Sequence, residues 1–352
     1  MKTAAIVGWD IGGAHVKAAL LEGGRVRDAV QWPCPLWQGM DHLDTALAAA
    51  LERWPGLEDA SHAVTMTGEL VDLFEHREQG VARIAAALAA ALPGPRFFGG
   101  DAGWFGAAEA GAAWRDIASA NWRATARHCA LALASEQGLL VDVGSTTTDL
   151  VAFAGGRVLG ACRSDADRLA EGELVYHGVV RTPLCAFGPR IAWRGRPLNV
   201  MNEIFATSAD VYRLTGELDP AHDQQASADR APKDAAHSRA RLARMIGLDA
   251  RDADAAEWLE FARAWRGLQL AELRGQVERV AARHGLGPGT VAVAAGCGGF
   301  LVAELIPPHW RRCDYAGDVA RPAPGAPPQV PAWAGVGAAA VAVAALAGKE
   351  WR

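Results

Sequence analysis

Over the first hundred residues of the chain, short apolar runs alternate with segments whose apolar residues recur at helical spacing. Apolar runs predict strands at residues 4–11, 15–21, 25–31, 62–66 and 96–98. Leucine and alanine at helical spacing predict amphipathic helices over 41–54 and 78–92. The order is therefore three strands joined by short turns and then alternating helices and strands, which is typical of an α/β domain.

A second set of apolar runs begins near residue 138. It predicts strands at 139–143, 148–153 and 157–162. The alternation then lapses, because 219–236 is polar and is predicted to be a loop. Two further helices are predicted, over 239–246 and 253–284. A strand at 291–295 and a proline-rich connector at 322–331 precede a final helix predicted over 332–348.

Composition narrows the class of protein. With 352 residues, the chain is longer than one hydrophobic core usually grows, so two lobes are expected. A net charge of −5 provides no basic surface for nucleic acid. The six cysteines lack metal or disulfide spacing and are expected to be reduced and buried. We expect a cytoplasmic protein without a membrane partner, because no signal peptide precedes the first strand and the apolar stretch 332–347 is shorter than the ~20 residues of a membrane span.

A glycine-rich segment follows the first predicted strand. Its sequence from Val7 to Lys17 is Val-Gly-Trp-Asp-Ile-Gly-Gly-Ala-His-Val-Lys. Small residues at Gly12, Gly13 and Ala14 let backbone N–H groups approach an anion. Asp10 is a candidate ligand for Mg²⁺, which prefers a few carboxylates together with phosphate oxygens. The alternative is an aspartate that caps its own turn.

The same pattern recurs about 130 residues later. After the apolar run that ends at Val141, the chain reads Asp142, Val143, Gly144, Ser145, Thr146, Thr147, Thr148 and Asp149. Four successive hydroxyl groups are difficult to explain by packing, because each buried unpaired hydroxyl would cost about 1–3 kcal/mol. An anion would satisfy several of them together. Two such loops predict a pair of facing lobes that hold a polyphosphate and a divalent metal.

This pairing resembles the acetate/sugar kinase, heat-shock chaperone and actin superfamily. A third segment, Val291–Phe300, matches the glycine-rich turn that supports a nucleotide base in that superfamily, through Gly296, Gly298 and Gly299. The resemblance implies an α/β fold of two ribonuclease-H-like lobes with a central cleft. The lobes would be residues 1–135 and 136–352, with a substrate-binding insertion around 164–285. It also implies metal-orienting roles for Asp142 and Asp149, and ATP or another nucleotide as a ligand.

Other polar residues near the loops are candidates for catalysis. Strand alternation places His15 and Lys17 on one face, where Lys17 would contact a phosphate and His15 would act as a base or donor. Glu69 follows the strand at 62–66, and it is either a base or a helix N-terminal acid. His177 lies in a polar segment of the second half. The residues leave the identity of the base open among these groups and Glu173.

Two dense segments of the second half predict a substrate-binding wall. The first contributes Glu173, Tyr176, His177 and Arg181. The second contributes Asn202, Glu203 and Asp210, of which Glu203 and Asp210 share one helix face at a spacing of seven. The Arg181 guanidinium is suited to hold a carboxylate in a bidentate arrangement. The alternative interpretation is an internal polar network that joins the lobe to its insertion.

Longer motifs indicate a narrower family. They are the first two loops, Thr65–Leu70, Ala120–Ala126, Gly172–Leu184 and Asn202–Leu218. Together they resemble the hydantoinase/oxoprolinase-related proteins of the tetrahydromethanopterin-linked one-carbon pathway, from residue 6 to beyond 300. Archaeal relatives of this kind make methanofuran: they join an aminomethylfuran-methyl diphosphate to γ-glutamyltyramine, which forms an aryl ether and releases pyrophosphate. The resemblance therefore implies a transferase with a diphosphate donor, a phenolic acceptor and Mg²⁺.

Three other functions stay open from the sequence. A small-molecule kinase would use the same loops for ATP. An oxoprolinase-like ATPase subunit would need a partner chain, and the short length argues against a complete oxoprolinase. A non-catalytic assembly protein would bind a nucleotide without turnover. The sequence leaves a homo-oligomer open as well.

Overall fold

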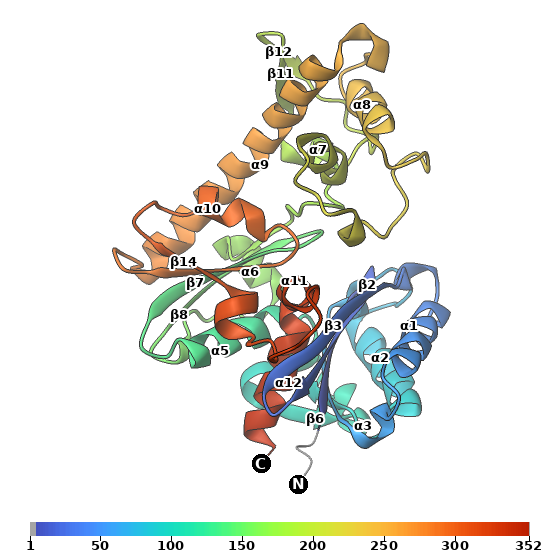
Figure 1. Ribbon diagram of the computed structural model, residues 1–352, viewed down its shortest axis with the longest axis vertical. Coiled ribbons are helices and arrows are strands. Elements are labelled where there is room, and N and C mark those ends of the chain that lie inside the picture. The colour runs from blue at the N-terminus through green and yellow to red at the C-terminus, as the bar shows by residue number, and fades with distance from the viewer. Residues whose placement is uncertain (1–4, 352) are drawn as a thin grey trace. The chain divides into compact units, whose positions relative to one another are not determined.

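The computed structural model describes residues 5–351 and divides the chain into two compact units (Figure 1). The first unit contains the chain up to Leu140, Val151–Asp167 and the chain from Cys313 onward. The second contains Val141–Leu150 and Arg168–Arg312. The C-terminal forty residues thus belong with the N-terminal strands.

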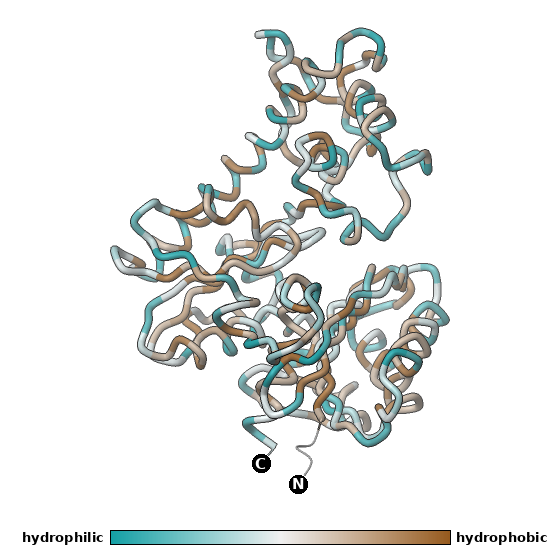
Figure 2. Tube along the Cα trace, in the orientation of Figure 1, coloured by the Kyte–Doolittle hydropathy of each residue, from teal (hydrophilic) through white to brown (hydrophobic). Residues whose placement is uncertain are grey.

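The first unit is built on a six-stranded sheet with the order β3-β2-β1-β4-β5-β6. Its strands are β1 Ile6–Ile11, β2 His15–Glu22, β3 Arg25–Pro33, β4 Ser61–Met66, β5 Arg96–Phe98 and β6 Trp104–Gly106. The first three strands are antiparallel, whereas β1, β4 and β5 run parallel. Figure 2 shows the apolar residues along these strands. The strand order β3-β2-β1-β4-β5 is that of a ribonuclease-H-like unit.

Helices cover both faces of this sheet. They are α1 Asp41–Arg53, α2 Arg77–Ala91, α3 Ala107–Ala110, α4 Trp114–Ile117, α5 Asn121–Ala132, α11 Val330–Val336 and α12 Ala338–Glu350. Trp9 of β1 packs in one core with Leu47 of α1 and Ile84 of α2. Ala63 of β4 packs in another core with Ala124 of α5 and Leu346 of α12. Ala63 pairs with Gly8, which is adjacent to Trp9 in β1. Because successive residues of a strand point to opposite faces, the two cores lie on opposite faces of the sheet.

A second sheet has the order β10-β8-β7-β13-β14, with β9 paired to β8. Its strands are β7 Gln137–Val143, β8 Thr148–Ala154, β9 Arg157–Val158, β10 Leu174–Val175, β13 Val291–Ala295 and β14 Arg311–Asp314. All five residues of β13 are buried, which is typical of a central strand. The chain between β7 and β8 is the second glycine loop.

The second unit also contains a helical subregion. Its helices are α6 Asp165–Glu171, α7 Ser208–Thr215, α8 Ala235–Arg244, α9 Ala255–His284 and α10 Val302–Leu305, and its hairpin strands are β11 Arg190–Trp193 and β12 Arg196–Asn199. Asp254 caps the N-terminus of α9 through the backbone N–H groups of Ala256 and Glu257, and Gly285 ends the helix in a left-handed conformation. Trp258 and Trp265 of α9 form a core with Leu242 of α8.

The predicted elements and the observed ones differ at a few positions. The strand predicted over 157–162 is shortened to Arg157–Val158, and α8 begins four residues earlier than predicted, where Asp234 accepts a hydrogen bond from the His237 backbone N–H. The helix predicted over 332–348 forms two helices that meet at Gly337 with a bend of 92°. Between residues 5 and 351, none of the six cysteines forms a disulfide, and four are buried.

The described part of the chain was also compared with the requirements of a membrane span. No single helix between residues 5 and 351 is both long enough and apolar enough to cross a membrane. The bent pair α11 and α12 meets the length and composition requirement only when the two helices are taken together.

Candidate active site

A row of polar residues crosses four strands of the first sheet. Asp10 of β1 lies opposite Lys17 of β2 and beside Thr65 of β4, and Lys17 lies opposite Gln31 of β3. Residues in register on neighbouring strands point to the same face of the sheet. Asp10 is only 6% exposed, and the Thr65 hydroxyl is buried without a hydrogen-bond partner. Strand pairing therefore brings Asp10 and Lys17 together, next to a threonine and a glutamine that the sequence analysis did not single out.

The N-terminus of α12 lies beside this polar row. A Cβ atom at Gly8 would clash with the carbonyl oxygen of Ala340, so only glycine allows α12 to pack this closely on β1. At Gly337, the N-cap of α12, a Cβ would lie 3.8 Å from Cβ of Lys17. The unpaired N–H groups of a helix N-terminus carry partial positive charge. Together with Lys17, they give this end of the sheet an environment suited to an anion.

The first glycine loop is a tight connection between β1 and β2. The Gly12 N–H donates to the His15 carbonyl oxygen at 2.9 Å, and the Thr67 N–H donates to the Ile11 carbonyl oxygen at 2.9 Å. Within the described residues, the Gly13 N–H has no acceptor. Ala14 and His15 are buried at the start of β2, and His15 shares the face of Lys17. The first glycine loop therefore contacts the segment after β4. Glu69 lies in that segment and is thus close to the loop.

Glu69 is a strongly perturbed carboxylic acid of the first unit. It lies in the short 3₁₀ helix Gly68–Leu70 and is 1% exposed, with α2 packed on its backbone at Gly80. Burial raises the pKa of Glu69 to about 7. The Ser119 hydroxyl donates to Oε1 at 2.9 Å, whereas Oε2 is buried without a hydrogen-bond partner. A carboxyl group with a pKa of about 7 and one oxygen that has no hydrogen-bond partner is suited to accept a proton near neutral pH.

The second loop uses its hydroxyl residues in different ways. The Thr148 hydroxyl donates to the His177 carbonyl oxygen at 2.7 Å, so it is satisfied within the protein. Ser145, Thr146 and Thr147 are half-buried, and their backbone N–H groups have no acceptor among the residues the structure describes. Gly144 closes the loop by donating its N–H to the Thr147 carbonyl oxygen. Three of the four predicted hydroxyl residues are thus available to an anion.

The segment after β10 supports this second loop. A Cβ atom at Gly178 would clash with Ser145 and Thr146, so glycine is required for this contact. The Arg181 backbone N–H donates to the Ser145 carbonyl oxygen at 2.8 Å, and its guanidinium donates to the Thr146 hydroxyl at 3.5 Å. Burial lowers the pKa of Arg181. Arg181 therefore reaches the loop expected to bind phosphate.

The third glycine turn lies against the end of β7. A Cβ atom at Gly296 would clash with the Val143 carbonyl oxygen and crowd Asp142 Oδ1. The Gly298 N–H donates to the Val143 carbonyl oxygen at 2.8 Å, and Gly299 begins a 3₁₀ turn. The predicted base-binding turn is thus next to Asp142, within one unit. Glycine at Gly296 permits both the close approach and a φ of 80°.

Three predicted site residues near the second loop contact other residues of the protein: Asp149, Glu173 and His177. The buried Arg168 guanidinium contacts Asp149 at 2.5 Å and the Glu173 carbonyl oxygen at 3.2 Å. Glu173 Oε1 lies 3.5 Å from the His284 ring. Burial lowers the pKa of His177. Its ring packs edge-on against the Phe187 ring, with 4.8 Å between the two ring centroids. Among these, the Arg168 contact was not anticipated, because Arg168 precedes the recognised motif and lies on α6.

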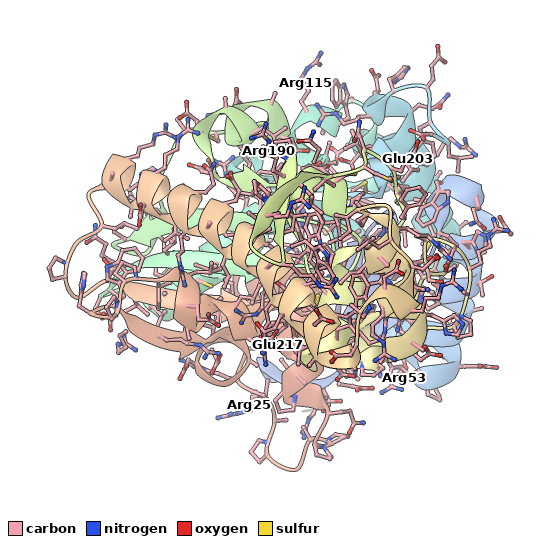
Figure 3. All side chains as sticks on the ribbon, turned by 90° about the horizontal axis from the view of Figure 1, so that it is seen from above. Arg25, Arg53, Arg115, Arg190, Glu203 and Glu217 are labelled. Carbon is pink, nitrogen blue, oxygen red and sulfur yellow. The ribbon has the colours of Figure 1, made fainter. Side chains whose placement is uncertain are left out.

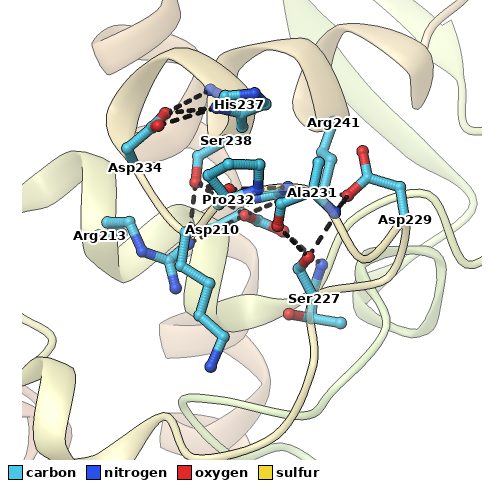
Figure 4. A network of polar contacts seen from close by, with 12 residues as sticks. Asp210, Arg213, Ser227, Asp229, Ala231, Pro232, Asp234, His237, Ser238 and Arg241 are labelled. Atoms are coloured by element: carbon cyan, nitrogen blue, oxygen red, sulfur yellow. Dashed lines mark hydrogen bonds and ion pairs between the residues drawn. The ribbon is translucent and has the colours of Figure 1, made fainter.

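The second predicted wall contains buried and exposed members. Asp210 is buried and accepts from Arg213 at 3.1 Å, from Ser238 at 2.8 Å and from Arg241 at 2.8 Å (Figure 4). These contacts are those of an internal polar network, the alternative to a substrate wall. Asn202 and Glu203 are exposed and precede α7, which begins at Ser208, so the prediction that Glu203 and Asp210 share one helix face is wrong (Figure 3).

Comparisons with known proteins show first the fold class of this chain and then the protein family to which it belongs. Nucleotide-free acetone carboxylase, an enzyme of ATP-dependent acetone carboxylation, is similar to this chain with a TM-score of 0.53 and 11% identity, over 85% of this chain and 66% of that one. This likeness shows the α/β fold with two sheets that the two glycine loops predict. Residues 61–307 match the hydantoinase/oxoprolinase family, and the chain belongs to it.

Two curated relatives carry the same printed name, (4-{4-[2-(gamma-L-glutamylamino)ethyl]phenoxymethyl}furan-2-yl)methanamine synthase. The one from Methanocaldococcus jannaschii is 30% identical over 302 residues, which are 86% of this chain and 88% of the relative. The one from Methanococcus vannielii is 28% identical over 148 residues, which are 42% of this chain and 66% of the relative. Both relatives are synthases, and the family predicted from the motifs is confirmed.

Proposed function

We propose that this protein is a transferase of methanofuran-type cofactor biosynthesis. It would join an aminomethylfuran-methyl diphosphate to γ-glutamyltyramine in the cytoplasm. The observation that carries the proposal is the 30% identity over 302 residues to a synthase whose name describes a phenoxymethylfuran product. The structure supports it through two loops with open N–H donors and a carboxyl group, Glu69, with a pKa of about 7.

In the proposed reaction, the phenol oxygen forms a bond to the furfuryl methylene carbon. The bond from that carbon to the diphosphate oxygen breaks, and its electron pair leaves with pyrophosphate. The phenol proton passes to Oε2 of Glu69, the oxygen without a partner. Within the first unit, Lys17 and the Gly13 N–H stabilise charge on the leaving group, which is the main catalytic contribution expected for such a departure.

The residues present fit Mg²⁺ bound mainly through the diphosphate. Between residues 5 and 351, no group of three His, Cys, Asp or Glu side chains forms a complete metal site. Mg²⁺ often uses one or two carboxylates together with phosphate oxygens, so a complete protein cluster is not required. Asp10, with the buried Thr65 hydroxyl beside it, is the proposed ligand in the first unit, and Asp142 is the matching candidate carboxylate of the second unit. When bound, the metal would neutralise charge on the diphosphate.

Arg181 and Tyr176 are proposed to bind the two substrates. The Arg181 contact with Thr146 favours a phosphate as the partner of its guanidinium. Tyr176 is 50% exposed and offers a ring on which the aromatic acceptor can pack. Asn202 and Glu203, both exposed, extend the proposed acceptor side within the inserted region 164–285.

The test is a product assay with the synthetic diphosphate and γ-glutamyltyramine. We expect the ether by mass spectrometry and one equivalent of pyrophosphate, with no product from the corresponding monophosphate. In the Glu69→Gln variant, kcat should fall at least ~100-fold while donor binding is unchanged, and Glu52→Gln, at an exposed glutamate outside the proposed site, is the control. The wild-type kcat should rise with pH up to about 7 and then level off. Absence of ether formation with the folded wild type would refute the proposal.

A second candidate is an ATP-dependent kinase or ATPase, favoured by the Gly296–Gly299 turn beside Asp142. Thermal protection distinguishes the two. The transferase should be protected by Mg²⁺ and pyrophosphate more than by Mg²⁺ and ADP. Stronger protection by ADP, together with phosphate release from ATP, would replace the transferase with this second candidate.

A further inference from the structure

The first unit contains a cavity of about 750 Å³ that is separate from the polar row. Its wall is formed by α5, α12, the start of β1 and the turn between β2 and β3, and none of Asp10, Lys17 or Glu69 lines it. Apolar side chains such as Leu131 and Ala344 cover much of the surface. The volume is in the range of small-molecule sites, about 300–1,000 Å³.

One buried imidazole opens onto this cavity. The His128 ring is 6% exposed, and its Nδ1 lies 2.8 Å from the Tyr315 hydroxyl. That hydroxyl donates its only hydrogen to the Ala338 carbonyl oxygen at 2.9 Å, so it must accept from His128 Nδ1–H. Nε2 of His128 is therefore a free acceptor in the neutral ring. Burial, with the charges of Lys349 and Arg321, lowers the pKa of His128 to about 3, so the ring stays neutral.

Two cations flank the cavity without acidic partners. Lys349 and Arg321 both line it and both act electrostatically on His128. Neither has a carboxylate partner among the residues that the structure describes. The neighbouring Glu350 is engaged elsewhere, by Arg127 at 2.8 Å and by the Trp104 indole N–H. Both residues are exposed and solvated, and they make the local charge at the cavity positive.

The backbone and one further donor reinforce this arrangement. Arg321 has a φ of 54°, a left-handed conformation that is uncommon for arginine. Its carbonyl oxygen accepts from the Val26 N–H, which fixes the residue at the cavity. The indole N–H of Trp351, another lining residue, is buried without an acceptor. The cavity thus combines an apolar wall with two exposed cations and the rings of His128 and Trp351.

We propose that this cavity binds a small amphipathic carboxylate whose apolar body lies against Leu131 and Ala344 and whose anionic group lies between Arg321 and Lys349. The rings of His128 and Trp351, which line the same cavity, contact the body of the ligand. The site is independent of the proposed transferase reaction, because it uses none of the residues assigned to that reaction.

The probes are 2-naphthoate and its neutral isostere 2-naphthamide, titrated into the full chain by calorimetry. We expect one naphthoate site, with an affinity at least ~10-fold higher than that for naphthamide. Arg321→Gln and Lys349→Gln should each weaken naphthoate binding about 5–10-fold and leave naphthamide binding unchanged. Arg196→Gln, which changes an exposed arginine of β12, is the matched control and should change neither.

A blocking variant tests the location. Ala345→Trp fills the cavity from the half-buried position of Ala345 on α12 and should abolish naphthoate binding while the melting temperature stays near the wild-type value. Saturating Mg²⁺ and pyrophosphate should leave naphthoate binding unchanged, which separates this site from the proposed active site. No naphthoate binding by the wild type, equal affinity for the two probes, competition by pyrophosphate, or normal binding by the Ala345→Trp variant would each overturn the proposal.

Discussion

At the scale of single residues, Glu69 couples stability to pH. Its pKa is about 7 in the folded chain against 4.5 for an ordinary glutamate, so the folded state holds the extra proton between these values. The contribution to stability is complete below pH 4.5 and is lost as the pH rises past 7. The Glu69→Gln variant should therefore be about 2–3 kcal/mol more stable than the wild type at pH 8 and nearly equal to it at pH 4.5, in urea unfolding.

The control for this prediction is Glu203→Gln, because Glu203 is exposed. Its free energy of unfolding should follow the wild type at both pH values. If Glu69→Gln shows no gain at pH 8, Glu69 is ionised in the folded protein without penalty, and its role as a base near neutral pH loses its physical basis.

Asp210 is the residue at which the two interpretations of the second wall can be separated. The fully buried Arg241 depends on it, at 2.8 Å, and removal of one partner of a buried ion pair costs about 3–5 kcal/mol. Asp210→Asn should lose about that much stability in urea unfolding. Asp101→Asn, which breaks an exposed pair with Arg123, should lose less than about 1 kcal/mol. Normal stability together with a raised KM for the acceptor would instead support the substrate wall.

At the scale of secondary-structure elements, the contact between β1 and α12 depends on Gly8. The Gly8→Ala variant places a methyl group against the Ala340 carbonyl oxygen, which must displace α12. We expect a loss of about 1–3 kcal/mol or more, measured by thermal and urea unfolding. The matched control is Gly267→Ala on α9, where a Cβ meets nothing within 4 Å. That substitution should stabilise the helix by about 0.5–1 kcal/mol, and equal effects at both positions would contradict the packing argument.

Most elements of the first unit could be predicted because their signals are local. The apolar runs and the Gly23–Gly24 turn define β1, β2 and β3 within two residues at each end. The break at Gly337 was not predicted, because the apolar pattern continues through it from residue 332 to 348. The strands β10 and β14 are short and carry little periodicity, so pairing in the sheet rather than sequence defines them.

The candidate site was predictable to a similar degree. Asp10, Gly12 and Lys17 follow from the pattern of the loop, because glycine and aspartate have few alternative uses there. Thr65 was hidden, since a threonine in a buried strand is an ordinary β-former until strand pairing places it beside Asp10. Arg168 was hidden for the same kind of reason: its contact with Asp149 is made in space, by α6 against β8.

At the scale of the whole molecule, the return of the C-terminus to the first unit determines the order in which the chain can fold during synthesis. The first sheet is complete by residue 106, yet Ala342 and Leu346 of its second core emerge more than 230 residues later. On the ribosome, that face of the sheet stays open while almost the whole second unit is made. Nascent chains stalled with 330 residues outside the ribosome should therefore be cleaved by protease in the first unit and resist cleavage within 168–312, and equal resistance of both would contradict this. The first unit is thus the first to begin folding and the last to be completed during synthesis.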